Sequence, residues 1–183
     1  MTTLDERFQK GIETRTKFGG GTLTGGSTPL AWPMAPDLEK ITGQFLFGSI
    51  WHRPALKDLQ REMVTLTCLT VLKRDNQTRR HLGNALNLGL RPIQIVEVLM
   101  HSMFYSGVPA TLDALAIARD VFEERGIDYT PQEVFDNSET PDDLYNRGMA
   151  RRIEYMGPPA SGGQGPATEA EKEFGRLTQE YYW

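Results

Sequence analysis

The segment from residue 56 to residue 126 constrains the fold most strongly, because its apolar side chains recur at helical spacing in four consecutive blocks. The blocks predict helices at 56–72, 77–88, 92–106 and 109–126. A proline opens each of the last two blocks, and a glycine follows each of the last three. We expect the first helix to be central and the third, apolar on nearly all sides, to be buried. These patterns predict an all-α fold.

The composition suits one globular domain with tails: 183 residues, of which 39% are hydrophobic and 24% are charged. No run approaches the ~20 apolar residues that a membrane-spanning helix needs, and the charged N-terminus lacks the apolar stretch of a signal peptide. The net charge of −4 comes without the long basic face that nucleic-acid phosphates require. We therefore expect a cytoplasmic protein that binds no membrane and no nucleic acid.

The single cysteine, Cys68, excludes an internal disulfide and a cluster of thiolate metal ligands. It lies between Leu66 and Leu69 in an apolar helical pattern. The sequence therefore predicts a buried, inert thiol at this position.

Five motifs follow one another between residues 51 and 110. They are Trp51-His52-Arg53-Pro54-Ala55-Leu56, Arg61-Glu62-Met63-Val64-Thr65-Leu66, Arg74-Asp75-Asn76-Gln77-Thr78-Arg79-Arg80-His81, Ala85-Leu86-Asn87-Leu88-Gly89 and Tyr105-Ser106-Gly107-Val108-Pro109-Ala110. In order and spacing these motifs resemble the carboxymuconolactone decarboxylase family. The resemblance implies a helical bundle of the alkylhydroperoxidase D-like superfamily, here with N- and C-terminal arms. It also implies a homo-oligomer, a trimer or a hexamer, with sites near subunit contacts and no metal or organic cofactor.

The reaction implied by the resemblance is the loss of CO2 from a γ-carboxylated butenolide. Two residues depart from the family pattern, and both favour an altered substrate. Gln77 stands where the decarboxylases usually place a glutamate, and His101 stands where many of them carry a glutamine. In the peroxidase branch of the superfamily two cysteines precede the histidine. Their positions here hold Arg74 and Gln77, which excludes a dithiol peroxidase.

His81, Glu62 and His101 are the catalytic candidates. His81 matches the active-site histidine of the superfamily, and imidazole can give or take a proton near neutral pH; the alternative is a satisfied core histidine. Glu62 matches the acidic position of the superfamily's proton relay, or is a helix-surface glutamate. Glu97, His101 and Tyr105 form a polar stripe on an apolar helix, which either lines a pocket or makes a subunit contact.

Loss of CO2 from such a substrate also needs cations for carboxylate groups and a donor for the developing oxyanion. Arg74 and Arg53 lie inside family motifs and are the expected substrate-binding cations, with Trp51 and Tyr105 as further substrate contacts. No metal site is expected, because Glu62, His81 and His101 match no local ligand motif. His52 should be exposed.

The chain divides into three expected regions: an N-terminal arm with a glycine-rich loop at 1–36, a core at 37–126 and a C-terminal extension at 127–183. Thr130-Pro131 and Thr140-Pro141 both have the pattern of a helix start. The extension also partly repeats the segment before the core, since Gly11, Glu39 and Gly43 match Gly148, Glu171 and Gly175. Two unrelated amphipathic segments are the alternative.

If the repeat is real, each copy should end in a helix, the first at about 37–51 and the second at about 168–183. The aromatic end of the second, Tyr181-Tyr182-Trp183, needs cover, which we expect across a subunit contact or over the pocket mouth near Trp51.

These observations predict a cofactor-independent decarboxylase that acts on a small carboxylated lactone, such as a 4-carboxymuconolactone-like compound, or on a related β-keto acid. Three alternatives stay open. They are another cofactor-free reaction, isomerisation or cyclisation, on a cyclic or polyketide-like substrate; a metal-dependent enzyme; and a non-catalytic oligomeric scaffold.

Overall fold

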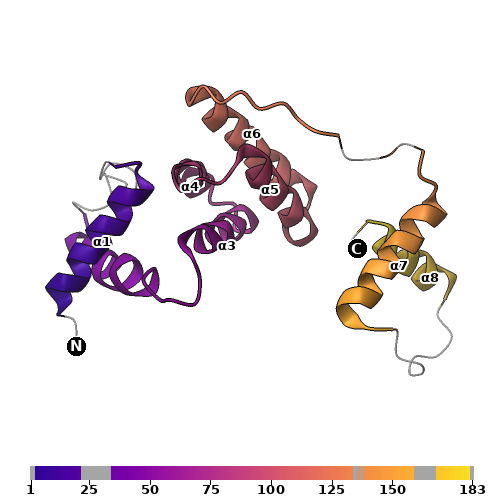
Figure 1. Cartoon of the computed structure of the whole chain (residues 1–183), viewed down its shortest axis with the longest axis horizontal. Coiled ribbons are helices and arrows are strands. Elements are labelled where there is room, and N and C mark those ends of the chain that lie inside the picture. Colours follow the sequence, from indigo (N-terminus) through magenta and orange to yellow (C-terminus); the bar gives the residue numbers. More distant parts are fainter. Residues whose placement is uncertain (1–2, 22–33, 134–135, 137, 159–167, 182–183) are drawn as a thin grey trace. The chain divides into compact units, whose positions relative to one another are not determined.

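A computed structural model describes residues 3–21, 34–133, 136, 138–158 and 168–181 of the chain (Figure 1). These residues form helices joined by turns and loops, with no strand in the described ranges, and this confirms the all-α prediction. None of the helices in these ranges is long and apolar enough to cross a bilayer. The chain forms two compact units, Met1–Pro131 and Gln132–Trp183, which are described in turn.

Four helices build the core of the first unit: α3 (Asp58–Val71), α4 (Asp75–Asn87), α5 (Pro92–Ser106) and α6 (Val108–Glu124). Each lies within two residues of its predicted bounds. As expected, α3 is central, since it contacts α4, α5 and α6. The three glycines predicted to end helices have positive φ angles, 91° at Gly89, 79° at Gly107 and 63° at Gly126. The buried core is formed by Leu66, Leu82, Ala85, Leu90, Ile95, Leu99, Ala114, Ala118, Val121 and Phe122.

In the first unit, α1 (Leu4–Phe18) packs on the π-helix η2 (Thr42–Ile50), which continues α2 (Pro36–Ile41); these three elements are called the N-terminal arm from here on. Glycines allow the two backbones to touch. A Cβ on Gly11 would lie 2.2 Å from the carbonyl oxygen of Gly43, and one on Gly48 would lie 1.9 Å from that of Arg7. Within the glycine-rich loop predicted at 18–27, residues 19–21 form a turn after α1, and residues 22–27 lie outside the described ranges.

Two predictions about burial in the core are wrong. Helix α5 is not buried all round, because Met100, Phe104 and Tyr105 lie exposed on one of its sides. Cys68 is exposed rather than buried. The buried side of α3 carries Glu62, Leu66 and Thr70, and position 68 lies on the opposite side. In both cases the sequence shows an apolar helix but not which of its sides its neighbours cover.

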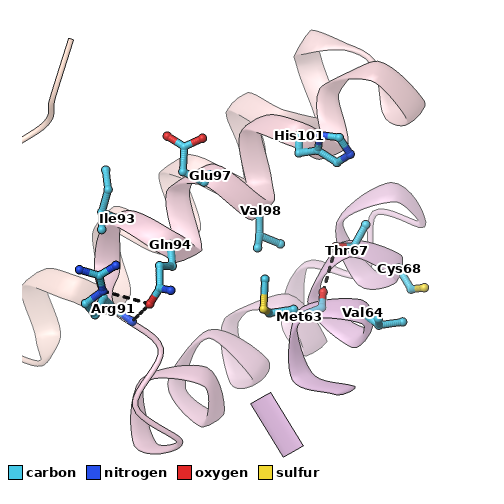
Figure 2. Close-up of a pocket in the computed structure, with 10 residues that line it drawn as sticks. All are labelled: Met63, Val64, Thr67, Cys68, Arg91, Ile93, Gln94, Glu97, Val98 and His101. Atoms are coloured by element: carbon cyan, nitrogen blue, oxygen red, sulfur yellow. Dashed lines mark hydrogen bonds between the residues drawn. The ribbon is translucent and has the colours of Figure 1, made fainter. Parts of the chain in front are cut away.

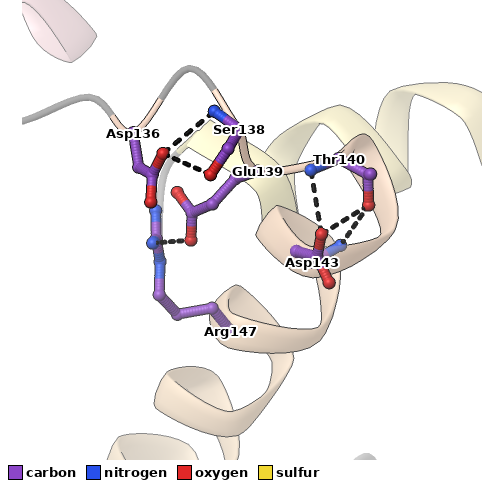
Figure 3. Close-up of polar contacts among 6 residues, drawn as sticks. All are labelled: Asp136, Ser138, Glu139, Thr140, Asp143 and Arg147. Atoms are coloured by element: carbon purple, nitrogen blue, oxygen red, sulfur yellow. Dashed lines mark hydrogen bonds and ion pairs between the residues drawn. The ribbon is translucent and has the colours of Figure 1, made fainter.

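The second unit contains α7 (Pro141–Met156) and α8 (Glu169–Tyr181). The predicted start at Thr140 is confirmed, because its side chain accepts a hydrogen bond from the Asp143 amide at 3.3 Å (Figure 3). Hydrogen bonds from Thr140 in turn lower the pKa of the Asp143 carboxyl. Just before α7, Glu139 pairs with Arg147. The predicted start at Thr130 is wrong, since residues 127–133 form no helix.

The α7–α8 pair uses the same backbone contact as the N-terminal arm. A Cβ on Gly148, the counterpart of Gly11, would lie 1.6 Å from the carbonyl oxygen of Gln179. The sequence match pairs Gly43 with Gly175 instead, but a Cβ on Gly175 would meet nothing within 4 Å. The helix expected at about 168–183 is observed at 169–181, and Tyr182 and Trp183 lie outside the described residues.

Replacing Gly148 with alanine should force α7 and α8 apart, because the new methyl group has no room beside the Gln179 carbonyl. The same change at Gly175 should stabilise α8 by up to about 1 kcal/mol, since alanine is the better helix former. Amide hydrogen exchange in α8 should be faster in Gly148→Ala and unchanged or slower in Gly175→Ala. Equal exchange in the two variants would contradict the contact.

Candidate active site

Glu62 of α3 and His81 of α4 form a hydrogen-bonded pair in the first unit. Nδ1 of His81 lies 2.6 Å from Oε1 of Glu62. The Glu62 side chain is fully buried, and 15% of the His81 side chain is exposed. Glu62 takes this place because it shares the buried side of α3 with Leu66 and Thr70, at intervals of four residues. Two of the three predicted catalytic residues are therefore in direct contact.

The buried carboxylate has an incomplete set of partners. Its second oxygen, Oε2, is buried and accepts no hydrogen bond from the described residues. Burying an unpaired charge away from water is unfavourable, so the hydrogen bond with His81 must offset the desolvation of the Glu62 carboxylate. With its Nδ1 held by Glu62, His81 has Nε2 left for a substrate. The carboxylate also stabilises the imidazolium that forms when Nε2 takes up a proton.

Arg74 and Gln77 lie near His81 along α4. The turn from α3 to α4 is made by Lys73, whose φ of 51° is positive, and Arg74 is the residue just before the helix. Positions 74, 77 and 81 fall on one side of α4, because intervals of three, four and seven residues nearly complete whole turns. Arg74 is exposed, so its guanidinium is available to a ligand on this side.

A second cation close to His81 in the chain has an altered pKa. Burial and the neighbouring charge of Arg15 in α1 lower the pKa of the Arg80 guanidinium. Arg15 is itself buried, and its Nη1 lies 3.7 Å from Oε1 of Glu39. Positive charge from α1 and from α4 therefore meets where the arm packs on the core.

His101 and Tyr105 lie elsewhere, on α5. Their rings are 5.9 Å apart, and His101 lines a pocket of about 680 Å³ between α3 and α5 (Figure 2). Figure 2 shows Met63 and Val98 facing each other across this pocket, with Arg91 towards one end and His101 at the other. Neither Glu62 nor His81 lines it. The structure thus places the predicted catalytic residues in two locations.

Trp51 and Arg53 lie at the junction between the arm and α3. Trp51 is buried against Phe18 and Phe47, with ring centroids 4.6 Å and 6.2 Å away. Arg53 is exposed, and its carbonyl accepts a hydrogen bond from Arg61 at 2.6 Å. His52 is exposed as expected, with its Nε2 2.9 Å from the Thr14 hydroxyl. Trp51 therefore packs the arm, while Arg53 stays accessible.

The sequence reasoning missed the α3 wall of the pocket, which is formed by Met63, Val64, Thr67 and Cys68. A signal was present: Val64 and Cys68 are four residues apart on the side of α3 opposite Leu66. Among the described residues, no three side chains of histidine, cysteine, aspartate or glutamate gather in an arrangement that could hold a metal ion.

Comparison with known proteins identifies the family of the chain. Residues 36–120 match the sequence profile of the carboxymuconolactone decarboxylase family. A 4-carboxymuconolactone decarboxylase of Acinetobacter baylyi is 30% identical over 130 residues, which cover 71% of this chain and 96% of that protein. A nitrosuccinic acid decarboxylase of Metarhizium robertsii is 24% identical over 117 residues, 64% of this chain and 82% of that protein. The chain belongs to the carboxymuconolactone decarboxylase family, with its all-α, alkylhydroperoxidase D-like fold.

Replacing Glu62 with leucine should change the free energy of unfolding by no more than about 1 kcal/mol, because it removes a costly buried carboxylate together with its hydrogen bond. Leu66→Ala, one turn further along the same buried side, should cost about 2–5 kcal/mol. Chemical denaturation of both variants checks this. A loss for Glu62→Leu as large as that for Leu66→Ala would indicate that Glu62 serves the stability of the fold.

Proposed function

We propose that this protein is a cofactor-independent carboxy-lyase that acts on a small carboxylated lactone or a related β-keto acid, with His81 as the proton-transfer residue. Membership of the family and two relatives named as decarboxylases support a decarboxylase-type function. The observation that carries the proposal further is the contact between His81 and the buried carboxylate of Glu62. A buried acid next to a partly exposed histidine is an arrangement suited to proton transfer.

The proposed reaction breaks the bond between the substrate carbon and its carboxylate. CO2 leaves without the bonding electrons, and the electron pair moves through the substrate onto an acceptor oxygen to give an enolate-type anion. His81 in its imidazolium form, stabilised by Glu62, then gives the proton on Nε2 to the carbon. A new proton from bulk solvent then reprotonates the imidazole, so each turnover consumes one solvent proton and the enzyme ends in the state in which it began. Every electron pair is taken up by the substrate itself.

Arg74 is the proposed binding residue for a substrate carboxylate. It precedes α4 on the side that carries His81, and its exposed guanidinium can hold a carboxylate through two parallel hydrogen bonds. The compounds named for the two relatives share one feature, a carboxylate on a carbon whose electron pair a neighbouring lactone or nitro group can accept. Arg53, Tyr105 and His101 are further candidates for substrate contacts. None of them is part of the His81–Glu62 pair.

A second candidate function is another cofactor-free reaction, isomerisation or cyclisation, on a cyclic or polyketide-like substrate. Gln77 supports it, because a neutral amide stands between Arg74 and His81 on the same side of α4. Isomerisation also uses a base that removes a proton and an acid that returns it, and the same His81–Glu62 pair suits both steps.

We further propose that the first unit assembles into a homo-oligomer, a trimer or a hexamer. Met100, Phe104, Val108 and Leu112 are large apolar residues that lie exposed along α5 and α6. Several large apolar side chains exposed along neighbouring helices are typical of a contact between subunits.

Wild-type protein should release CO2 from 4-carboxymuconolactone, from nitrosuccinic acid or from a member of a panel of β-keto acids, in buffer that contains EDTA. His81→Ala should lower the turnover of the responsive compound by about 10²-fold or more, because general acid–base catalysis is lost. His52→Ala is the matched control, since that exposed histidine lies at the junction between the arm and α3 and contacts Thr14, and it should retain wild-type turnover. Circular dichroism confirms that both variants are folded.

Near wild-type turnover of His81→Ala would contradict the assignment of the residue. CO2 release that EDTA abolishes and a divalent metal restores would contradict cofactor independence. Conversion of a cyclic substrate without CO2 release would favour the second candidate.

A further inference from the structure

Helix α8 packs against α7 with its polar side. Its closest approach is at Gln179, whose carbonyl lies beside Gly148. Nearby, Arg176 donates to Glu180 at 2.7 Å and lies over the ring of Tyr145 at 5.8 Å, and only 5% of the Glu180 side chain is exposed. An amphipathic helix normally buries its apolar side first. Within the second unit, α8 does the reverse.

The apolar side of α8 faces away from α7. It carries Phe174, Leu177 and Tyr181, which we call the α8 stripe. These residues are three and four positions apart, so they lie on one side of the helix, and each is between 44% and 74% exposed. Phe174 lies five residues before Gln179, Leu177 two before it and Tyr181 two after it. At these spacings their side chains point away from the contact between Gln179 and Gly148.

The N-terminal arm carries the same arrangement. Leu38, Ile41 and Phe45 are between 47% and 61% exposed. Leu38 lies five residues before Gly43, Ile41 two before it and Phe45 two after it. The residues of the α8 stripe have the same three spacings from Gln179. In each unit, therefore, a glycine of the first helix touches the second helix, and the second helix turns three apolar residues outwards. The two units therefore expose an apolar side at equivalent positions of their second helices.

We propose that the α8 stripe is the contact surface for a second copy of this chain, with α8 lying antiparallel on the partner's α8. The spacing of the stripe complements itself, because Leu177 lies almost midway between Phe174 and Tyr181. A two-fold axis at Leu177 sets that residue against its own copy and each Phe174 against the partner's Tyr181. Contacts of this two-fold kind are the commonest in soluble oligomers.

The charge of α8 and the size of the unit favour a second copy over a membrane surface. The helix holds four glutamates, at 169, 171, 173 and 180, against Lys172 and Arg176. Helices that lie on membranes carry a basic polar side instead. A pair of helices also cannot enclose a core of its own, since so small a unit buries too little apolar surface. Pairing through α8 covers that helix on both sides, by α7 and by the partner.

Disulfide trapping tests this pairing directly, because Cys68 is the single cysteine of the chain. In a Cys68→Ser background, Leu177→Cys should form a covalent dimer under mild oxidation, which non-reducing electrophoresis detects. Lys172→Cys is the matched control, since this exposed residue lies on the other side of α8, and it should link at least about tenfold more slowly. Equal rates for the two variants, or no dimer from Leu177→Cys, would overturn the proposal.

Light scattering of the full chain gives an independent readout. Leu177→Glu places a charge in the middle of the stripe and should separate the paired copies, so that a hexamer of two trimers falls to a trimer, while Lys172→Glu should leave the particle mass unchanged. CO2 release per chain should persist in both variants, because neither substitution changes a residue proposed for catalysis or substrate binding. An unchanged particle mass for Leu177→Glu would overturn the pairing, whereas loss of CO2 release in His81→Ala concerns the proposed function alone.

Discussion

The hydrogen bond between His81 and Glu62 is the interaction on which the candidate site depends. It joins α4 to α3 where the side chain of Glu62 is fully buried and one carboxylate oxygen has no partner among the described residues. A hydrophobic residue would pack there at less cost, since burying a carboxylate requires compensation. The proposed proton transfer by His81 gives a reason for this unfavourable burial of the Glu62 carboxylate. Leu66, one turn after Glu62 on α3, and Leu82, which follows His81 on α4, are fully buried core residues.

The core helices follow from the sequence because apolar periodicity, prolines and glycines are local signals. The glycines at 89, 107 and 126 adopt positive φ angles that other residues rarely take, so they mark helix ends reliably. The exposure of Cys68 and of one side of α5 did not follow, because periodicity shows where a helix is apolar but not which neighbour covers it. The helix start predicted at Thr130 is wrong for a related reason. A Thr-Pro pair permits a helix to begin, but it is not followed by an amphipathic pattern whose packing would stabilise a helix.

Within the site, the motif pattern names Glu62 and His81 as candidates and the structure brings the two side chains into contact, whereas the place of His101 could not be foreseen. Sequence spacing predicts which residues lie on the same side of one helix. Gln77 and His81 lie on α4, and Arg74 is the N-cap of that helix. His101 stands on another helix, and its side chain direction depends on how α5 packs on α3. The α1–η2 pair and the α7–α8 pair also show that contacts between helices cannot be predicted from spacing along the sequence. Their glycines are visible in the sequence, but the contact of Gly148 with Gln179 rather than Gly175 is a property of packing.

The position of the proton on the His81 ring shows whether His81 and Glu62 form a pair suited to proton transfer. The chain has three histidines, so nitrogen-15 NMR of the ring nitrogens can be assigned with single variants. We expect Nδ1 to carry a proton that is hydrogen-bonded to Glu62 while Nε2 is bare in the neutral ring, and we expect Glu62→Gln to shift the Nδ1 resonance. A ring with a bare Nδ1, or an Nδ1 resonance that Glu62→Gln leaves unchanged, would contradict this expectation.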